Sequence, residues 1–329
     1  MKMYLGVDVG SVTTKLALLD EADNLVESVY LLTRGEPIAA IQEGLRRIAT
    51  AMPPGARIGG AGTTGSARFL AGVITGADLV KNEITTHAVA TLHYYPDVRT
   101  IFEIGGQDSK ITLVRDGVVT DFAMNTVCAA GTGSFLDHQA LRLNMTIEEL
   151  SQRALASRMP VRIAGRCTVF AESDMVHKQQ MGHRVDDILY GLCQALVRNY
   201  LGNVGLGKEI LPPIVFQGGV AFNQAIVRAF REELGTDIIV PPHHEVMGAI
   251  GAALLVHEEM EEAGAESTFH GFARSEAHYD TSSFECKACP NHCEVAQLSL
   301  EGKVLARWGG RCDMWERVTA DSRQGMPSG

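Results

Sequence analysis

The stretch Asp8-Val-Gly-Ser-Val-Thr-Thr-Lys15 lies where one short apolar run, residues 4–9, gives way to another, residues 16–19. A strand, a tight turn and a second strand are predicted, because a glycine and several hydroxyl residues interrupt two runs of β-type residues. The glycine would let backbone N–H groups approach an anion, so the turn suits a phosphate group and a hydrated Mg²⁺. The side chains able to bind them are those of Asp8, Ser11, Thr13 and Thr14.

The same pattern returns 95 residues later as Glu103-Ile-Gly-Gly-Gln-Asp-Ser-Lys110, again followed by apolar residues. A constant offset across chemically similar pairs indicates an internal duplication. Two related hairpins facing each other would place two phosphate-binding turns across a cleft, whereas two unrelated hairpins with polar bends are the alternative. The matching pairs are Asp8 with Glu103, Gly10 with Gly105, Thr14 with Ser109, Lys15 with Lys110, Leu16 with Ile111 and Leu18 with Leu113.

Composition restricts the class of protein. The chain has 329 residues, of which 46% are hydrophobic, so it can form two globular domains with ordinary cores. Its net charge is -10 and it has no run of Lys or Arg, which disfavours nucleic acid or an anionic membrane as a partner. Charge appears too early at the N-terminus for a signal peptide, and no 18 apolar residues are consecutive, so we expect a cytoplasmic protein.

Two cysteines stand in small-residue segments that each open a predicted helix. Cys128 precedes a helix expected over residues 135–143, and Cys167 precedes one expected over residues 169–179. A helix N-terminus stabilises a thiolate or an anionic cluster. Two cysteines cannot complete a four-thiolate iron–sulfur cluster, so a two-fold dimer would have to supply two from each chain. The alternative is that both are small buried residues.

Several other patterns are interpreted as scaffold. Cys193 lies on an apolar helical stripe and is predicted to be core, and residues 36–52 form an amphipathic helix. Gly60-Ala-Gly-Thr-Thr-Gly65 fits a dinucleotide-binding pattern only weakly, because a very short strand precedes it. Gly202-Asn-Val-Gly-Leu-Gly-Lys208 is rejected as a P-loop, since Glu209 replaces the Mg²⁺-binding hydroxyl.

A strand over residues 211–217 leads into Gly218-Gly-Val-Ala-Phe-Asn223 and a helix. Paired glycines at such a bend would let a flat base lie against the backbone, and Asn223 could hydrogen-bond to that base. His243 and His244 follow in a loop and are interpreted as surface residues, before a helix rich in small residues that could pack closely.

The ordered set of Asp8 to Lys15, Glu103 to Lys110, Gly218-Gly-Val220 and Gly248-Ala-Ile-Gly251 resembles the acetate kinase/Hsp70/actin ATPase superfamily. Cys128-Ala-Ala-Gly-Thr-Gly133 and Gly165-Arg-Cys-Thr-Val-Phe-Ala-Glu-Ser173 resemble, within it, the activators of 2-hydroxyacyl-CoA dehydratases and the ATPase subunits of benzoyl-CoA reductase. The resemblance spans residues 3–256. It implies an α/β fold of duplicated actin/Hsp70-like, ribonuclease H-like domains around a nucleotide cleft.

The resemblance also implies a homodimer with one [4Fe-4S] cluster at its interface, bound by Cys128 and Cys167 of both chains. ATP or ADP would lie in each cleft, with Mg²⁺ near Asp8 and Asp108 and with Gln107 orienting the attacking water. Asp8, Gln107 and Asp108 are thus the expected catalytic residues. The remaining nucleotide- and cluster-binding residues would be Gly10, Ser11, Val12, Thr13, Thr14, Lys15, Gly105, Gly106, Gly131, Gly133, Gly218, Gly219, Val220, Asn223 and Gly248.

The function implied is an ATP-hydrolysing one-electron donor. A ferredoxin or flavodoxin would load the electron, and ATP binding would drive its transfer to an iron–sulfur enzyme of the acyl-CoA dehydratase or reductase type. Such coupling requires that nucleotide binds two conformations with different affinity. Two alternatives stay open: a small-molecule kinase of the same superfamily with structural cysteines, and a nucleotide-gated zinc scaffold.

The C-terminal part departs from this pattern. Residues 258–283 are predicted to be a linker, and Cys286-Lys-Ala-Cys-Pro-Asn-His-Cys293 follows, with Cys312 farther on. Four cysteines suffice for Zn²⁺ or a second iron–sulfur cluster, although His292 could replace one of them. This appendage resembles the junction after the ATPase module in long fused activase-like proteins. The expected domains are 1–97 and 98–257 for the ATPase, with the final helix packing back on the first, a metal-binding module over 284–316 and a disordered tail over 317–329.

Overall fold

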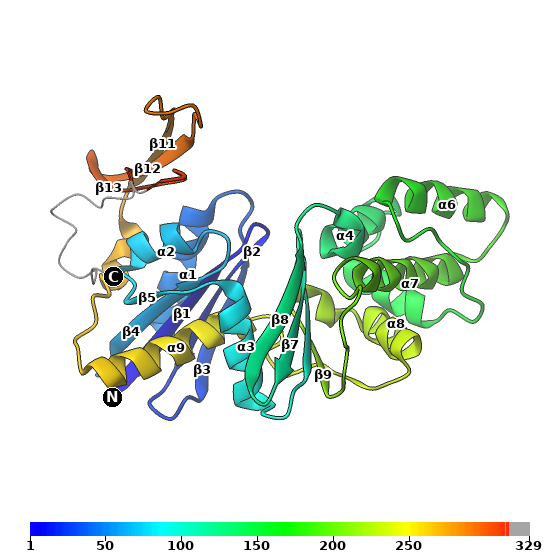
Figure 1. Ribbon diagram of the computed structural model, residues 1–329, viewed down its shortest axis with the longest axis horizontal. Coiled ribbons are helices and arrows are strands. Elements are labelled where there is room, and N and C mark those ends of the chain that lie inside the picture. Colours follow the sequence, from blue (N-terminus) through cyan, green and yellow to red (C-terminus); the bar gives the residue numbers. More distant parts are fainter. Residues whose placement is uncertain (313, 316–329) are drawn as a thin grey trace. The chain divides into compact units, whose positions relative to one another are not determined.

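The computed structural model describes residues 1–312, 314 and 315. The chain divides into two compact units, one formed by residues 1–89 and 248 onward, the other by Ala90–Met247 (Figure 1). The chain passes from the first unit to the second within α3 (Glu83–Tyr94) and returns at the start of α9 (Met247–Ala263). The expected tail over 317–329 lies outside the described residues.

The first unit is built on a five-stranded sheet of order β3-β2-β1-β4-β5. β1 pairs antiparallel with β2 and parallel with β4. Successive side chains of a strand point to opposite faces, and β1 therefore sends Met3, Leu5 and Val7 to one face and Gly6 and Asp8 to the other. The strands are β1 (Lys2–Val9), β2 (Thr13–Leu19), β3 (Leu25–Leu32), β4 (Arg57–Thr64) and β5 (Leu79–Val80).

Helices α1 (Pro37–Ala51) and α2 (Arg68–Thr75) cover the apolar face of this sheet. Ile41, Leu45 and Ile48 recur at helical spacing on α1 and are fully buried, which confirms the amphipathic helix predicted over residues 36–52. Burial of these aliphatic side chains is the main favourable contribution to the packing of α1 against the sheet.

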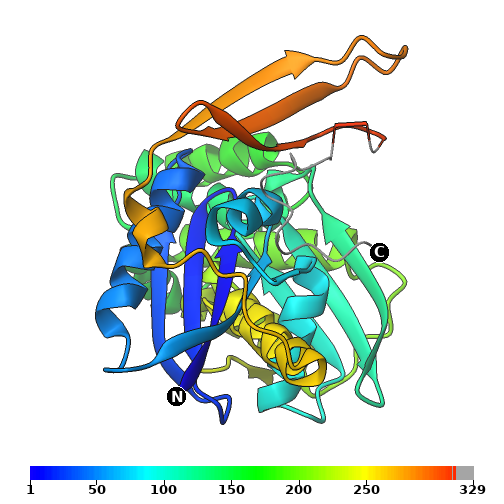
Figure 2. The ribbon, with the colours of Figure 1, turned by 90° about the vertical axis from the view of Figure 1, so that its left-hand side faces the viewer.

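The other face of the sheet meets α9 at unusually short distance (Figures 1 and 2). A Cβ atom on Gly6 would lie 1.8 Å from the carbonyl oxygen of Ala249, and one on Gly62 would lie 2.4 Å from that of Ala252. The Gly60 to Gly65 stretch therefore differs from a dinucleotide-binding loop: most of it lies within β4, where its glycines let a helix approach the strand.

The second unit repeats this sheet, with the order β10-β9-β6-β7-β8. β6 pairs antiparallel with β7 and parallel with β9, as β1 pairs with β2 and β4. The registers also correspond, because Asp8 lies opposite Lys15 and Glu103 lies opposite Lys110. The duplication inferred from the sequence is thus present in the topology. The strands are β6 (Thr100–Ile104), β7 (Ser109–Arg115), β8 (Val118–Asn125), β9 (Ile214–Gln217) and β10 (Ile238–Ile239).

Helices of the second unit enclose an aromatic core. Phe102, Tyr200, Phe216 and Phe230 meet with ring centroids 5.0 to 5.4 Å apart, and Cys193 is fully buried on α7, as predicted. None of the helices described in either unit combines the length and the apolar character that a membrane-spanning segment needs. The helices are η1 (Ala129–Gly131), α4 (Gly133–Arg142), α5 (Ile147–Leu155), α6 (Thr168–Gln180), α7 (Val185–Asn203), η2 (Gly219–Phe222) and α8 (Gln224–Leu234).

Residues 258–283, predicted to be a linker, are instead partly helical and bound to the first unit. Helix α9 continues to Ala263, and the chain that follows is fastened to the first unit, because Ser267 and Thr268 both donate hydrogen bonds to Asp78. Asp78 also accepts a hydrogen bond from the backbone of Ala61, so its carboxylate joins β4 to this segment.

A three-stranded antiparallel sheet completes the first unit (Figure 2). Its strand β11 begins inside the predicted linker, and the fully buried Leu298 of β12 joins the apolar cluster of α1 and α2. The elements of this part are η3 (Phe272–Glu276), β11 (Tyr279–Glu285), β12 (Glu294–Leu300) and β13 (Lys303–Trp308).

Replacing Gly6 with alanine tests the close approach of α9. The new methyl group would overlap the backbone of Ala249, so Gly6→Ala should lower the free energy of unfolding by about 3 kcal/mol or more. Gly202→Ala is the control: a Cβ there meets no atom within 4 Å, and alanine favours the helix by up to ~1 kcal/mol. Equal melting temperatures for Gly6→Ala and the wild type would contradict this packing.

Candidate functional site

The β1–β2 turn of the first unit is held tightly by its own backbone and by Thr33. The N–H of Gly10 donates to the carbonyl of Thr13 at 2.9 Å. Thr33 donates from its N–H to the carbonyl of Val12 at 2.8 Å and from its hydroxyl to that of Gly10 at 3.1 Å. Sequence reasoning did not find Thr33, because it lies about twenty residues beyond the motif.

Asp8 is buried beside this turn and is paired with Lys15. Its carboxylate lies 3.1 Å from the Lys15 ammonium group, directly across the β1–β2 ladder. Two glycines fit closely around it, since a Cβ on Gly65 would lie 2.5 Å from Oδ1 and one on Gly248 would lie 2.7 Å from Oδ2. Gly248, which was predicted to be a nucleotide-binding residue, therefore lies beside Asp8. Its missing side chain leaves room for the Asp8 carboxylate at the start of α9.

The hydroxyl residues of the turn fall into two groups. Ser11 is exposed, and Val12 and Thr13 are half-buried, so these residues are open to a ligand. Thr14 is fully buried, and its hydroxyl lies 2.9 Å from that of Thr33. The structure thus turns Thr14 toward the interior of the unit, where its hydroxyl supports the turn.

The β6–β7 turn of the second unit has the same construction. The N–H of Gly105 donates to the carbonyl of Asp108 at 3.0 Å, matching the bond from Gly10 to Thr13. The Lys110 ammonium group lies 3.1 Å from Glu103 Oε1 and also 3.1 Å from Asp108 Oδ2. Gln107 is exposed at the tip of the turn.

Helix α4 begins directly on this second turn. The N–H of Gly133 donates to the carbonyl of Gly105 at 2.9 Å, and the N–H of Ser134 donates to that of Gly106 at 2.8 Å. These amides belong to the first turn of a helix and have no partner within it. A Cβ on Gly133 would lie 2.9 Å from Val220 and 3.1 Å from the carbonyl oxygen of Gly105, so any larger residue would crowd this approach.

The loop from β8 to α4 carries Cys128. Asn125 shapes this loop, because its Oδ1 accepts the N–H of Cys128 at 3.0 Å and its Nδ2 donates to the Cys128 carbonyl at 2.8 Å. Cys128 precedes η1 and Cys167 is the N-cap residue of α6. Both thiols are half-buried, and the helices begin where the sequence placed them, within two residues.

One side chain of α7 contacts both cysteine-bearing segments. The Nδ2 of Asn199 donates to the carbonyl of Gly165 at 2.5 Å and lies 4.0 Å from Cys128 Sγ. Its Oδ1 would lie 2.8 Å from a Cβ on Gly131, which explains the glycine at that position. Asn199 is buried in the last third of α7 and belongs to no sequence motif.

The bend after β9 brings together Gly218, Asn223 and His244. Gly218 has a φ of +93°, and its carbonyl lies 3.1 Å from His244 Nδ1. Burial lowers the pKa of His244, so a neutral imidazole can donate from Nδ1 to this carbonyl. His244 was expected to be a surface residue but instead fixes the conformation of the glycine bend.

Asn223 caps α8 and keeps one polar atom unused. Its Oδ1 accepts the N–H groups of Ala225 at 3.0 Å and Ile226 at 3.3 Å. Its buried Nδ2 has no hydrogen-bond partner within the part of the chain that the structure describes. A buried donor without a partner is costly, so this amide is suited to a ligand acceptor.

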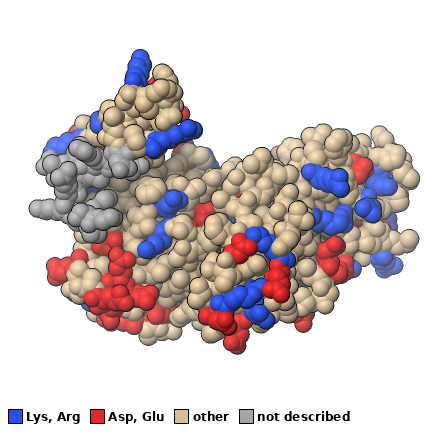
Figure 3. All heavy atoms as spheres, viewed as in Figure 1, with Lys and Arg blue, Asp and Glu red and all other residues tan. Residues whose placement is uncertain are grey.

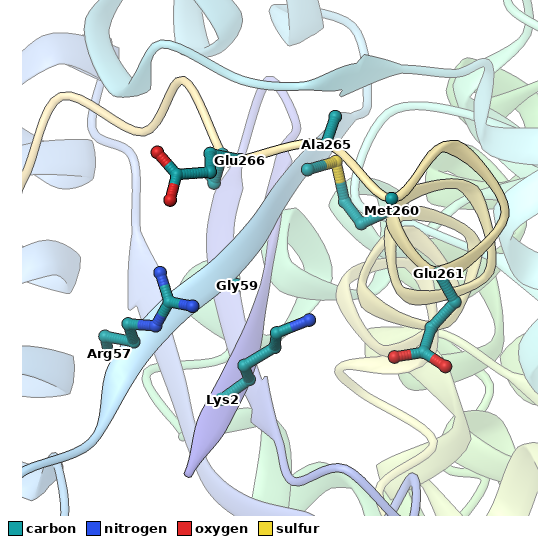
Figure 4. Close-up of a pocket in the computed structure, with 9 residues that line it drawn as sticks. Lys2, Arg57, Gly59, Met260, Glu261, Ala265 and Glu266 are labelled. Carbon is teal, nitrogen blue, oxygen red and sulfur yellow. The ribbon is translucent and has the colours of Figure 1, made fainter.

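A hollow of about 320 Å³ opens elsewhere in the first unit (Figure 4). It is lined by Lys2 and Arg57 at the beginnings of β1 and β4, and by Glu261 and Glu266. Lys2 and Asp8 occupy opposite ends of β1, roughly 20 Å apart at the usual rise per residue. The hollow is therefore separate from the turns described above. Acidic side chains gather near it over the end of α9 (Figure 3).

The C-terminal cysteines lie at one end of the three-stranded sheet. Cys286, Cys289 and Cys293 belong to the β11–β12 connection, and Cys312 follows β13. Among residues 1–312, 314 and 315, no three or more His, Cys, Asp or Glu side chains are grouped so that they could hold a metal ion.

Comparison with known proteins agrees with this architecture. Residues 5–256 match the BadF/BadG/BcrA/BcrD ATPase family. The chain is 33% identical over 279 residues to the 2-hydroxyisocaproyl-CoA dehydratase activator of Clostridioides difficile, covering 80% of this chain and 98% of that protein. It is 34% identical over 267 residues to the (R)-2-hydroxyglutaryl-CoA dehydratase activating ATPase of Acidaminococcus fermentans, covering 79% and 99%.

Two solved structures of such activators resemble this one. Component A of the Acidaminococcus fermentans dehydratase superposes with a TM-score of 0.72 at 31% identity, covering 79% of this chain and all of that one. The Clostridium difficile activator with bound ADPNP gives 0.71 at 32% identity, covering 80% and 97%. Both units therefore have the actin/Hsp70-like ATPase fold predicted from the sequence. The chain belongs to the BadF/BadG/BcrA/BcrD ATPase family, and the protein is an ATPase.

Proposed function

We propose that this ATPase is a one-electron donor that activates an iron–sulfur enzyme of the acyl-CoA dehydratase or reductase type. The names of its relatives support an activating role, since they are dehydratase activators. The main support for the proposal is the pair of hydrogen bonds from the first amides of α4 to the β6–β7 turn. Because the Cys128 loop leads directly into α4, these bonds link the turn to that loop within one unit.

The residues around Cys128 and Cys167 fit an iron–sulfur cluster. Cys167 is the N-cap residue of α6, and Cys128 directly precedes η1 in the loop that leads into α4. The positive end of a helix dipole stabilises a nearby anionic cluster. Asn199 contacts both segments and can donate a hydrogen bond toward sulfur. A [4Fe-4S] cluster, which requires four thiolates, would be held by Cys128 and Cys167 of two chains and would supply a one-electron carrier.

Exposed apolar side chains flank both cysteines, which supports a homodimer. Val127 precedes Cys128 and is 95% exposed, while Val169 and Phe170 follow Cys167 and are 65% and 67% exposed. Apolar side chains gathered in this way are typical of an interaction surface. We propose that the second chain covers them and so brings four thiols together.

The two turns would bind the nucleotide's phosphates and Mg²⁺. We expect the N–H groups and hydroxyls at Ser11 and Thr13, which are exposed or half-buried, to contact phosphate, and Asp8 and Asp108 to bind Mg²⁺ directly or through water. Gln107 would orient the attacking water. The glycine bend at Gly218 and Gly219 would receive the base, with the unused Nδ2 of Asn223 as a donor.

Coupling would pass through backbone contacts. Phosphate bound at Gly105 and Gly106 would position the carbonyls that accept the amides of Gly133 and Ser134, and α4 would move with them. The Cys128 loop precedes α4 directly, so a change at the turn changes the surroundings of the thiol. This requires that ATP and ADP stabilise two arrangements of the turn unequally. A ferredoxin or flavodoxin is the proposed source of the electron.

Iron content tests the proposed cluster. After anaerobic purification, Cys128→Ser and Cys167→Ser should each lose about four iron atoms per dimer relative to the wild type, because each removes two of four thiolates. The EPR signal of the dithionite-reduced protein should disappear with that iron. Cys193→Ala is the control, since Cys193 is buried on α7 and should leave iron unchanged. Wild-type iron in Cys128→Ser would refute the bridging cluster and favour a kinase with structural cysteines.

Substitution at Gly133 tests the coupling. Gly133→Ala would push α4 away from the Gly105 carbonyl, so the difference between ATP and ADP in the rate of iron loss to a chelator should shrink roughly fivefold or more. Ser134→Ala removes a hydroxyl but keeps the backbone amide, and should retain the wild-type difference. If Gly133→Ala binds nucleotide normally and keeps the full difference, the α4 contact does not carry the coupling.

A further inference from the structure

The C-terminal sheet lies beyond residue 256, where the family match ends. Its fully buried apolar side chains are few, namely Val295 and Leu298 on β12, with Ala306 on β13 also buried. Leu298 packs into the apolar cluster of α1 and α2, so the sheet has little apolar core of its own, and segments with so small a core are commonly stabilised by a metal or by disulfides. The end of the sheet that carries the cysteines is therefore the place to look for a further stabilising contact.

In the β11–β12 connection, the backbone segments that carry Cys286, Cys289 and Cys293 lie close together. Glu285 and Glu294 are the last register pair, and the N–H of Cys286 donates to the carbonyl of Cys293 at 2.8 Å just beyond it. Between them, the N–H of His292 approaches the carbonyl of Cys289 at 3.4 Å, so the loop folds back on itself. Three thiols thus belong to one tight hairpin end.

The segment after β13 returns to the same hairpin end. Gly309 has a φ of +99°, and a Cβ there would lie 2.7 Å from the carbonyl oxygen of Glu294. At the other side of Cys312, the indole N–H of Trp315 donates to Cys286 Sγ at 3.1 Å, and its ring meets Phe284 at 4.9 Å. Cys312 therefore lies on a short segment whose two ends both contact the hairpin that carries the other three thiols.

We propose that Cys286, Cys289, Cys293 and Cys312 form a four-thiolate Zn²⁺ site that fastens the segment after β13 to the β11–β12 hairpin. Zn²⁺ bound by four thiolates at about 2.3 Å needs its sulfur atoms under about 4 Å apart, a spacing that a tight hairpin can provide. A larger iron–sulfur cluster needs wider spacing and cover from solvent, whereas Cys289 and Cys312 are exposed. The four thiols are not grouped for a metal in the structure, so binding of the metal must draw them together, as the coupling of metal binding to local folding allows.

The hydrogen bond from Trp315 suits a metal-bound thiolate. Donors aimed at ligating sulfur orient the ligand and stabilise its negative charge, and the indole N–H of Trp315 already points at Cys286. His292 is the competing ligand on this hairpin. Its Nδ1 contacts the Glu285 carboxylate, which leaves Nε2 able to face a metal in place of Cys312.

The test is the metal content of the full chain, with cobalt as a probe. Zinc should be bound at about one ion per chain, and replacement by Co²⁺ should give the visible absorption of tetrahedral cobalt with four thiolates. Cys289→Ser and Cys312→Ser should each lower zinc to below about a fifth of the wild-type content. Cys128→Ser is the matched control and should keep its zinc, because Cys128 belongs to the other unit.

Three results would overturn the proposal. The first is a wild-type chain without zinc after growth in zinc-supplemented medium, together with no cobalt spectrum, a measurement that does not depend on how any variant folds. The second is iron in place of zinc, retained in Cys128→Ser and lost in Cys289→Ser. The third is zinc retained in Cys312→Ser but lost in His292→Ala, which would remove Cys312 from the ligand set.

Discussion

Two backbone hydrogen bonds join the β6–β7 turn of the second unit to the start of helix α4. They run from the amides of Gly133 and Ser134 to the carbonyls of Gly105 and Gly106. On one side of them lies the β6–β7 turn, which we propose binds phosphate, and on the other lies the loop that carries Cys128. Because the amides at a helix start have no partner inside the helix, the turn satisfies them, and α4 is fixed to it. The same contact favours glycine at position 133, because a Cβ there would crowd Val220 and the Gly105 carbonyl.

Both turns arise from the duplicated hairpin, but only the second unit has a long helical insertion after it. Each copy keeps a carboxylate and a lysine opposite each other, Asp8 with Lys15 and Glu103 with Lys110, at the base of its turn. Between β3 and β4 the first unit has the single helix α1, whereas between β8 and β9 the second unit has η1 and α4 to α7. Both Cys128 and Cys167 belong to that longer insertion, which explains why the β6–β7 hairpin adjoins the loop that carries a thiol.

Much of the fold could be predicted from the sequence because it depends on local patterns. The constant offset between Asp8 and Glu103 predicted the repeated sheet, and the stripe that includes Cys193 predicted a buried helix. Contacts between distant residues could not be predicted in this way. Thr33 supports the first turn, Asn199 spans the two cysteine segments and Asp78 fastens the segment after α9, and none of them belongs to a motif. The glycines of β4 resembled a ligand loop because close helix packing and close ligand approach impose the same requirement for a missing Cβ.

Amide hydrogen exchange with and without ADPNP shows whether the β6–β7 turn and the Cys128 loop respond to nucleotide together. If the α4 amides join the phosphate turn to the cysteine loop, nucleotide should slow exchange at residues 105–110 and also at residues 126–142, including Gly133 and Ser134. Slowed exchange at the turn with no change from 126 to 142 would contradict the account, because the two segments would then respond to nucleotide independently.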